Sequence, residues 1–280
     1  MAARPARADG VDRGRRGRRA ALRVVVVQPA GPGRGERQRR RRHRRHDHRR
    51  GEVTVRVVIL GITTGLGARL AESLLERGTT PVGLVRKAEQ APGLKAAGVE
   101  PVVLDPDSGE VGSVVMEAMN GAQAVVLAAG TGTGPGSLGA ATATASPAAL
   151  LSAAAERVGV RRFVLVSALL PGAAERAALG DDLPSYLWEK AKAERVVRER
   201  DLDWCVLRPG RLEDTPPTGR IRLRSGTDPA PEGHISRADL AGTITQMLSE
   251  PRLVRRVLAV SAGLHEIPAA LAASASASVT

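Results

Sequence analysis

Apolar residues along most of the chain gather in short runs that alternate with stretches of helical spacing. Residues 53–60 read VTVRVVIL, a β-branched run that stops at Gly61, and residues 68–77 place three leucines at helical spacing before Gly78. This pattern predicts a strand, a glycine turn and a helix that ends at a glycine cap. The same alternation continues to about residue 260.

The remaining segments predict a series of βα units. Strands are expected at residues 80–85, 99–104, 124–128, 162–166, 204–208 and 256–260, and helices at 88–97, 111–120, 147–157, 184–200 and 236–249. The strands are continuous Val and Leu runs, as a parallel sheet covered on both faces requires. The sequence therefore predicts an α/β fold with a doubly wound, mostly parallel sheet, in a single domain over residues 52–265.

The charge of the chain is concentrated at one end. The formal net charge is +13 over 280 residues, but residues 1–50 hold 18 arginines against four acidic residues, and the rest holds 24 basic and 25 acidic residues. Like-charge repulsion predicts a disordered Arg-rich extension over residues 1–51. It is an arm that binds nucleic acid through phosphates, an extension without function before a native start near Val53, or a mitochondrial transit peptide.

Composition excludes several other classes of protein. Cys205 is the single cysteine, so an internal disulfide, a CxxC pair and a four-cysteine zinc site are excluded, and we expect no metal and a reducing, cytoplasmic location. No run approaches the roughly 18 apolar residues of a membrane span. Four aromatic residues are too few for a platform that stacks single-stranded nucleic acid. Residues 266–280 are rich in Ala and Ser and are expected to form a flexible tail.

The first βα turn reads GITTGLG and is a candidate for dinucleotide binding. Its glycines would allow a tight turn and a close approach of the backbone to a diphosphate, and the following helix would present free N–H groups to that anion. A tight turn without a ligand is the alternative. The residues expected to bind the cofactor here are Gly61, Thr63, Thr64, Gly65, Leu66 and Gly67.

The ends of the next strands carry further candidates. Arg86 and Lys87 end the second strand, where the adenosine ribose of a dinucleotide should lie. A guanidinium pairs well with a 2′-phosphate, so NADP is predicted, with NAD also possible. Asp105 ends the third strand and either accepts from the adenine amino group or forms a turn. The fourth strand closes on small residues that would let the cofactor approach: Ala128, Ala129 and Gly130.

A tyrosine and a lysine point to chemistry. Tyr186 is the only tyrosine, and Lys190 lies four residues later in a helical stretch, so both lie on one face. A nearby ammonium favours the phenolate, which would let Tyr186 exchange a proton with a carbonyl or alcohol oxygen at neutral pH. Ser167, at the end of the fifth strand, is placed to hold the same oxygen. The alternative is a packed helix in which Tyr186 and Trp188 are buried and Lys190 is exposed.

These motifs together resemble a known superfamily. GITTGLG, LVR, RRFVLVS, YLWEKAKAER, DWCVLRPGRL and ISRADLA occur in the order and spacing of the short-chain dehydrogenases/reductases, and most resemble the atypical NmrA-like branch that includes flavin and biliverdin reductases. The resemblance covers about residues 53–263. It implies a Rossmann-type fold, cofactor contacts at the residues above, active-site positions at Ser167, Tyr186 and Lys190, and a nicotinamide and substrate border at Pro209 and Gly210. Thr64 departs from it, because many relatives have a glycine there.

The expected function is that of an oxidoreductase. It would bind NADP(H) and transfer hydride to or from a small carbonyl, quinone or flavin-like substrate. A non-catalytic NADP(H) sensor and an NAD(P)-dependent epimerase are alternatives. The expected partner is a small molecule, with nucleic acid bound only through the Arg-rich extension, no membrane contact, and a monomeric or homodimeric state.

Overall fold

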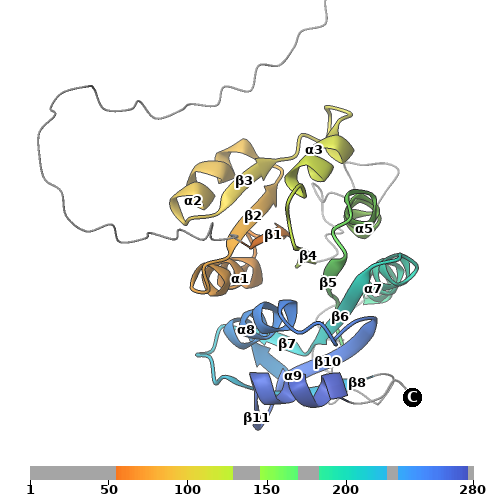
Figure 1. The fold of residues 1–280 in the computed structure, drawn as a ribbon. Helices are drawn as coiled ribbons and strands as arrows, with labels where there is room; N and C mark the ends of the chain where they lie inside the picture. Colours follow the sequence, from red (N-terminus) through yellow and green to blue (C-terminus); the bar gives the residue numbers. More distant parts are fainter. Residues whose placement is uncertain (1–54, 129–145, 170–182, 226–232, 277–280) are drawn as a thin grey trace, which may run out of the picture. The chain divides into compact units, whose positions relative to one another are not determined.

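The computed structural model describes residues 55–128, 146–169, 183–225 and 233–276. Within these residues a nine-stranded sheet forms the centre of the domain (Figure 1). Its strands are β1 (Arg56–Leu60), β2 (Thr80–Val85), β3 (Glu100–Val103), β4 (Ala124–Leu127), β5 (Arg162–Val166), β6 (Asp203–Pro209), β8 (Arg220–Ser225), β10 (Arg256–Ala262) and β11 (His265–Glu266). Two short strands, β7 (Arg211–Glu213) and β9 (His234–Ser236), pair with each other in a separate sheet.

The strand order defines the fold. β3, β2, β1, β4, β5, β6 and β10 follow one another across the sheet, and each neighbouring pair is parallel. β8 pairs antiparallel with β10 and with β11. The order 3-2-1-4-5-6 is that of the Rossmann fold, so the predicted doubly wound sheet is confirmed. The order reverses between β1 and β4, which is where ligands bind in such folds.

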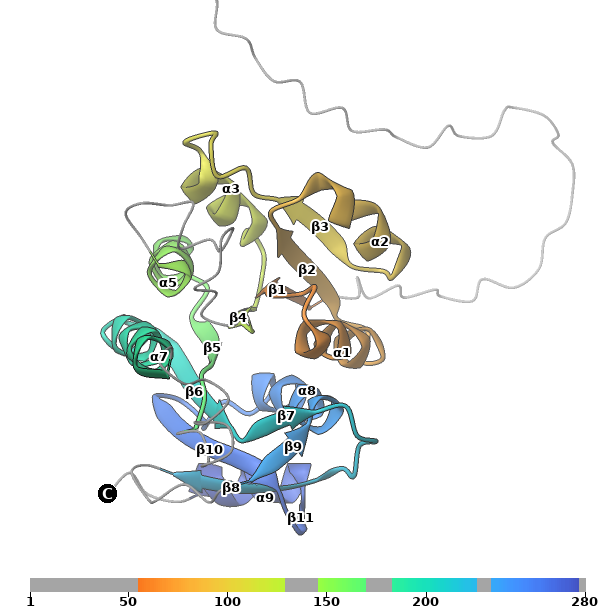
Figure 2. The ribbon, with the colours of Figure 1, turned by 180° about the vertical axis from the view of Figure 1, so that it is seen from behind.

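Helices cover both faces of the sheet (Figures 1 and 2). One face packs against α1 (Gly65–Leu75), α8 (Arg237–Leu248) and α9 (Ile267–Ser276). The other face packs against α3 (Val111–Ala118), α5 (Pro147–Val158) and α7 (Leu183–Arg198). A short 3-10 turn (Ala88–Gln90) and α2 (Ala91–Ala96) connect β2 to β3. No helix in the described ranges is long and apolar enough to cross a membrane.

The strands are apolar along their whole length because both faces meet helices. In β1, Val57 and Ile59 belong to the core shared with α1 and α8, whereas Val58 and Leu60 belong to the core shared with α3 and α5. All four side chains are buried. Period-two alternation would have left one face in water, so the continuous apolar runs correctly predicted a sheet covered on both sides.

The carboxyl-terminal segment differs from the expectation. The predicted flexible tail over residues 266–280 is wrong for most of its length, because α9 occupies Ile267–Ser276. Ile267, Ala270 and Leu271 are buried at helical spacing, and α9 packs against β8 and α8. Alanine and leucine favour a helix, so a composition that resembles a low-complexity tail also suits an amphipathic helix. The predicted extension over residues 1–51 lies outside the described residues.

The start of α1 lies directly against the end of β1. A Cβ atom added at Gly67 would lie 2.0 Å from the carbonyl oxygen of Gly61 and 2.6 Å from the Cα of Ile62. Both neighbours are backbone atoms, which cannot move aside without displacing the strand. Only glycine therefore allows helix and strand to pack this closely.

Replacing Gly67 by alanine should destabilise the domain. We expect Gly67→Ala to lower the free energy of unfolding by about 3 kcal/mol, because the methyl group forces the strand and helix apart. Urea denaturation followed by circular dichroism measures the change. Gly112→Ala is the matched control, because Gly112 lies in α3 with no atom within 4 Å of an added Cβ. It should leave stability equal or up to about 1 kcal/mol higher; equal losses in both variants would contradict the packing argument.

Candidate functional site

The glycine turn between β1 and α1 forms a cradle of backbone N–H groups. Gly61 has φ 95°, a left-handed conformation that glycine adopts without strain. The Thr64 hydroxyl donates to the Gly61 carbonyl oxygen at 2.7 Å and accepts from the Gly67 N–H at 3.0 Å. The N–H groups of Gly65 and Leu66 have no hydrogen-bond partner within the described part of the chain. Two free donors at the positive end of a helix suit an anion.

Thr64 caps α1, a role that the resemblance to relatives with a glycine at this position did not predict. It is the N-cap of α1, with extended backbone angles, and its side chain closes the turn. Threonine is a favoured capping residue. The departure from a middle glycine is therefore compatible with the turn, and Thr63 beside it is exposed.

The other predicted cofactor residues lie at the carboxyl ends of β2, β3 and β4. Arg86 follows β2 and is exposed, with no ion-pair partner among the described residues. Asp105 accepts from the N–H of Asp107 at 3.0 Å through Oδ1, so it forms the turn that was one of its two predicted roles. Ala128 is buried, and its N–H donates to the Leu60 carbonyl oxygen at 2.9 Å. Ala129 and Gly130 lie outside the described residues.

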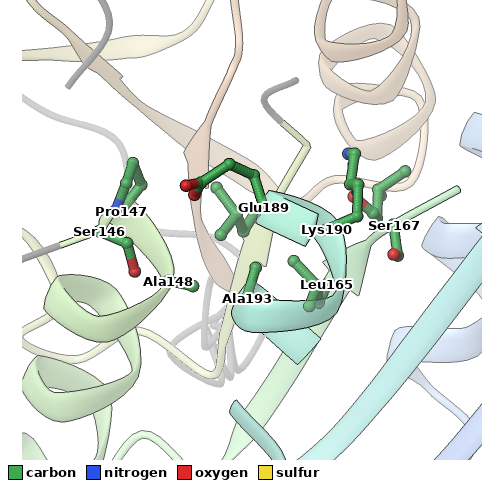
Figure 3. A pocket seen from close by; sticks show the side chains of 10 residues that line it. Ser146, Pro147, Ala148, Leu165, Ser167, Glu189, Lys190 and Ala193 are labelled. Atoms are coloured by element: carbon green, nitrogen blue, oxygen red, sulfur yellow. The ribbon is translucent and has the colours of Figure 1, made fainter. Parts of the chain in front are cut away.

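A pocket opens at the carboxyl ends of β4 and β5, between α5 and α7 (Figure 3). The start of α5 forms one wall, where Ser146 caps the helix through the N–H of Ala149. The opposite wall is α7, and Figure 3 shows Ser167 and Lys190 together at one end. The lining residues are Leu127, Ser146, Pro147, Ala148, Leu165, Val166, Ser167, Glu189, Lys190 and Ala193.

Lys190 is a buried cation within this pocket. Its side chain is 9% exposed, and Nζ donates to the carbonyl oxygen of Val166 at 3.3 Å. Burial lowers the pKa of Lys190 to about 8, and the nearby Glu194 carboxylate opposes this shift. Trp188 is 59% exposed. The alternative in which Trp188 packs and Lys190 is exposed is therefore wrong. Tyr186 lies one helical turn before Lys190 on α7, and its side chain is outside the described part of the structure.

An ion pair between a buried carboxylate and a partly exposed guanidinium lies beside the pocket, and it was not predicted from the sequence. Glu194 is 5% exposed and accepts from Arg208 twice, from Nε at 2.9 Å and from NH2 at 2.6 Å. It also accepts from the hydroxyl of Ser167 at 2.5 Å. Glu194 follows Lys190 by four residues on α7, and this spacing was the available sequence signal.

The contact with Glu194 changes what Ser167 can do. A serine hydroxyl has one proton, and the proton of Ser167 is donated to Glu194. What Ser167 offers to the pocket is its oxygen lone pairs, which accept hydrogen bonds. In this arrangement Ser167 is an acceptor for a hydroxyl group and not a donor to a carbonyl oxygen.

Pro209 and Gly210 lie where β6 leaves the sheet. A Cβ added at Gly210 would lie 2.1 Å from the carbonyl oxygen of Gly233, so the close passage of two backbones requires this glycine. The Pro209 carbonyl oxygen accepts from the N–H of Leu169 at 3.0 Å, which ties this segment to the residues after β5. The glycine is thus explained by backbone packing.

Comparison with protein families decides which family these features belong to. A family model described as NAD(P)H-binding matches residues 61–251, which is more than half of the chain. The chain belongs to this family of NAD(P)H-binding proteins. The matched segment begins at Gly61, the first residue of the glycine turn.

Individual relatives agree with this family assignment. The uncharacterised sugar epimerase YhfK of Bacillus subtilis is 29% identical over 218 residues, which are 78% of this chain and 99% of the relative. A putative NAD-dependent epimerase/dehydratase of Bacillus halodurans superposes with a TM-score of 0.66 at 25% identity, covering 78% of this chain and 99% of the other. ChuY, an anaerobilin reductase of Escherichia coli O157:H7, superposes with a TM-score of 0.61 at 25% identity, covering 74% of this chain and 97% of the other.

The residues of the glycine turn fit the dinucleotide that the family implies. Gly65 carries no side chain toward the turn, and two backbone N–H groups there have no partner in the described ranges. This donor set suits a diphosphate. Among the described residues, no group of three or more His, Cys, Asp and Glu side chains could hold a metal ion.

Removing the partner of Glu194 should destabilise the domain strongly. We expect Arg208→Met to lower the free energy of unfolding by about 3 kcal/mol, because it leaves a buried carboxylate without its cation. The double variant Glu194→Gln/Arg208→Met should lower the free energy of unfolding by less, since it leaves no buried carboxylate without its guanidinium partner. Urea denaturation at pH 7 compares them.

The control for this experiment is an exposed ion pair. Arg69 and Glu72 pair at 2.9 Å with side chains more than half exposed. Arg69→Met should change stability by less than about 1 kcal/mol. If the double variant Glu194→Gln/Arg208→Met lost as much free energy of unfolding as Arg208→Met, the unpaired buried carboxylate would not be the cause of the destabilisation.

Proposed function

We propose that this chain is an NADP(H)-dependent oxidoreductase that transfers hydride to or from a small carbonyl, quinone or flavin-like substrate. The observation that carries the proposal is the buried Lys190, one turn after Tyr186 on α7, in a pocket at the carboxyl ends of β4 and β5. Ligands of doubly wound folds bind at this edge of the sheet. Buried lysines are rare, and side chains with a strongly shifted pKa in a cleft are concentrated at functional sites.

In this proposal some residues bind the cofactor and others transfer a proton. The N–H groups of Gly65 and Leu66 would hold the diphosphate at the start of α1. NADPH, when bound, supplies a hydride for the carbonyl carbon of the substrate. Tyr186 would give its phenolic proton to the carbonyl oxygen. The Lys190 ammonium would favour the phenolate that remains, because opposite charges attract strongly away from water.

Ser167 would assist in a different way from the one that the sequence suggests. Because its hydroxyl donates a hydrogen bond to Glu194, its oxygen would accept a hydrogen bond from the hydroxyl of Tyr186 or from an alcohol product. Either contact would orient the reacting oxygen. The rigid Glu194–Arg208 pair would hold Ser167 in this state.

Arg86 supports the preference for NADP over NAD. Its exposed side chain follows β2, where the adenosine ribose binds in Rossmann folds, and it has no competing ion pair among the described residues. A guanidinium and a phosphate form strong paired hydrogen bonds. The relatives support oxidoreductase chemistry only in general terms, since one is described as a reductase and two as epimerases or dehydratases.

The proposal is tested by cofactor binding and turnover. We expect the wild-type protein to bind NADPH in calorimetry and to oxidise it with at least one member of a panel of quinones, flavins and aldehydes. Tyr186→Phe should leave the Kd for NADPH within about twofold and lower kcat by about 100-fold or more, because it removes the proton donor.

Two other results would contradict an oxidoreductase. Binding without oxidation, unaffected by Tyr186→Phe, would indicate a cofactor sensor. Conversion of a sugar nucleotide without net oxidation of NADPH would indicate an epimerase, the activity in the description of the Bacillus subtilis relative.

The pH dependence of turnover should report Lys190. Its ammonium is present below pH 8 and is lost as the pH rises, because the pKa of Lys190 is lowered to about 8. We therefore expect kcat/KM to fall as the pH passes from about 7 to 9. Lys190→Arg keeps a cation at all these values. It should lower the rate but remove this fall; a fall at the same pH in Lys190→Arg would assign the titration to another group.

A further inference from the structure

The segment ISRADLA at the start of α8 contains three polar residues, and two of them have structural roles. Ser236 is the N-cap of α8 and accepts from the N–H of Asp239 at 2.9 Å. Asp239 is buried and accepts from the N–H groups of Thr218 and Gly219, which fixes the loop before β8. Arg237, between them, contributes to neither contact.

Arg237 reaches from the first position of α8 to the first position of α1. The Cδ and Nε atoms of Arg237 both lie 3.1 Å from the point where a Cβ of Gly65 would be. The two helices pack side by side, as both ribbon views show (Figures 1 and 2). The guanidinium therefore lies beside Gly65, the first residue of α1, with Cζ 3.9 Å from the point where its Cβ would be.

The ion pair of Arg237 does not account for this position. NH1 lies 2.8 Å from Oδ2 of Asp214, whose side chain is 79% exposed, whereas that of Arg237 is 27% exposed. Such pairs contribute about 0–1 kcal/mol. A cation in the first turn of a helix is disfavoured by the helix dipole, and here the positive ends of α1 and α8 both face the guanidinium. The Asp214 carboxylate is exposed, and the buried Asp239 carboxylate in the first turn of α8 accepts from the N–H groups of Thr218 and Gly219, so this positive charge is offset only in part.

We propose that Arg237 is a cofactor-binding residue that contacts the diphosphate of the dinucleotide, together with the N–H groups of Gly65 and Leu66. The inference rests on the proposed cofactor binding and adds a residue to that site. A diphosphate carries more charge than one carboxylate and presents oxygens that match the planar donors of a guanidinium. The diphosphate would take the place of the exposed Asp214 carboxylate at the guanidinium.

The position of Arg237 predicts which part of the cofactor it contacts. Gly65 begins α1, where the diphosphate binds in Rossmann folds, whereas Arg86 ends β2, where the ribose binds. NADPH and NADH share the diphosphate and differ only in the 2′-phosphate. Loss of Arg237 should therefore weaken both cofactors equally, and loss of Arg86 should weaken only NADPH.

The experiment measures the Kd of NADPH and NADH by calorimetry on the full chain. Arg237→Gln should raise both Kd values by the same factor, about 10-fold to 100-fold, because a hydrogen bond to a charged group is lost. Arg86→Gln, the matched variant, should raise the Kd of NADPH and leave that of NADH within about twofold. Arg237→Met keeps the apolar stem over Gly65 and should show the same equal losses if the glutamine variant does not fold.

The remaining outcomes separate this inference from the proposed function. Unchanged Kd values in a folded Arg237 variant would overturn the inference alone. A wild-type protein that binds neither nucleotide would overturn the proposed function as well. Asp214→Asn removes the ion pair and keeps the guanidinium, so it should leave both Kd values within about threefold. A loss as large as that of Arg237→Gln would show that the ion pair, and not contact with the cofactor, is what matters.

Discussion

The close approach of α1 to β1 is the constraint on which the cofactor edge of the sheet depends. Because Gly67 has no side chain, the helix begins directly at the carbonyl oxygen of Gly61. The hydroxyl of Thr64 accepts from the N–H of Gly67 and its carbonyl oxygen from that of Ala68, whereas the described residues offer no acceptor to the N–H groups of Gly65 and Leu66. The free donors of Gly65 and Leu66 follow from this geometry. The position of Arg237 follows from the packing of α8 on α1, which brings the amino ends of the two helices together.

A second constraint acts on the other face of the sheet, where α7 buries charged residues beside the pocket. Lys190 and Glu194 lie one turn apart on the same helix, and both are almost fully buried. Glu194 remains in the interior because Arg208 and Ser167 supply its hydrogen bonds. Burial makes Lys190 a weaker base, because it lowers the pKa of the ammonium group. The Glu194–Arg208 ion pair and the buried Lys190 therefore lie on the same side of the sheet, beside one pocket.

Sequence reasoning predicted the parallel part of the fold well and the antiparallel part poorly. Strands such as β1 and β4 are continuous β-branched runs bounded by glycine or polar residues, which is a strong signal for a buried strand. β8 reads RIRLRS, which alternates polar and apolar residues instead of forming a continuous apolar run, and β7 and β9 have three residues each. α9 was lost because its alanines resemble a tail. Short and polar elements are defined by their partners, which the sequence does not name.

The residues of the candidate site likewise include some that the sequence pointed to and some that it did not. The glycine turn and the Tyr186–Lys190 spacing could be recognised in the sequence, because each is formed by residues close together along the chain. Glu194 and Arg237 were not, because each acts on a residue far away along the chain: Arg208 and Ser167 for one, Gly65 for the other. The two sets of charges also lie on opposite faces of the sheet, in α7 and in α1 with α8. Under the proposed function, separate helices would supply binding energy for the diphosphate and proton chemistry for the substrate, and a substitution at one site would not alter the contacts of the other.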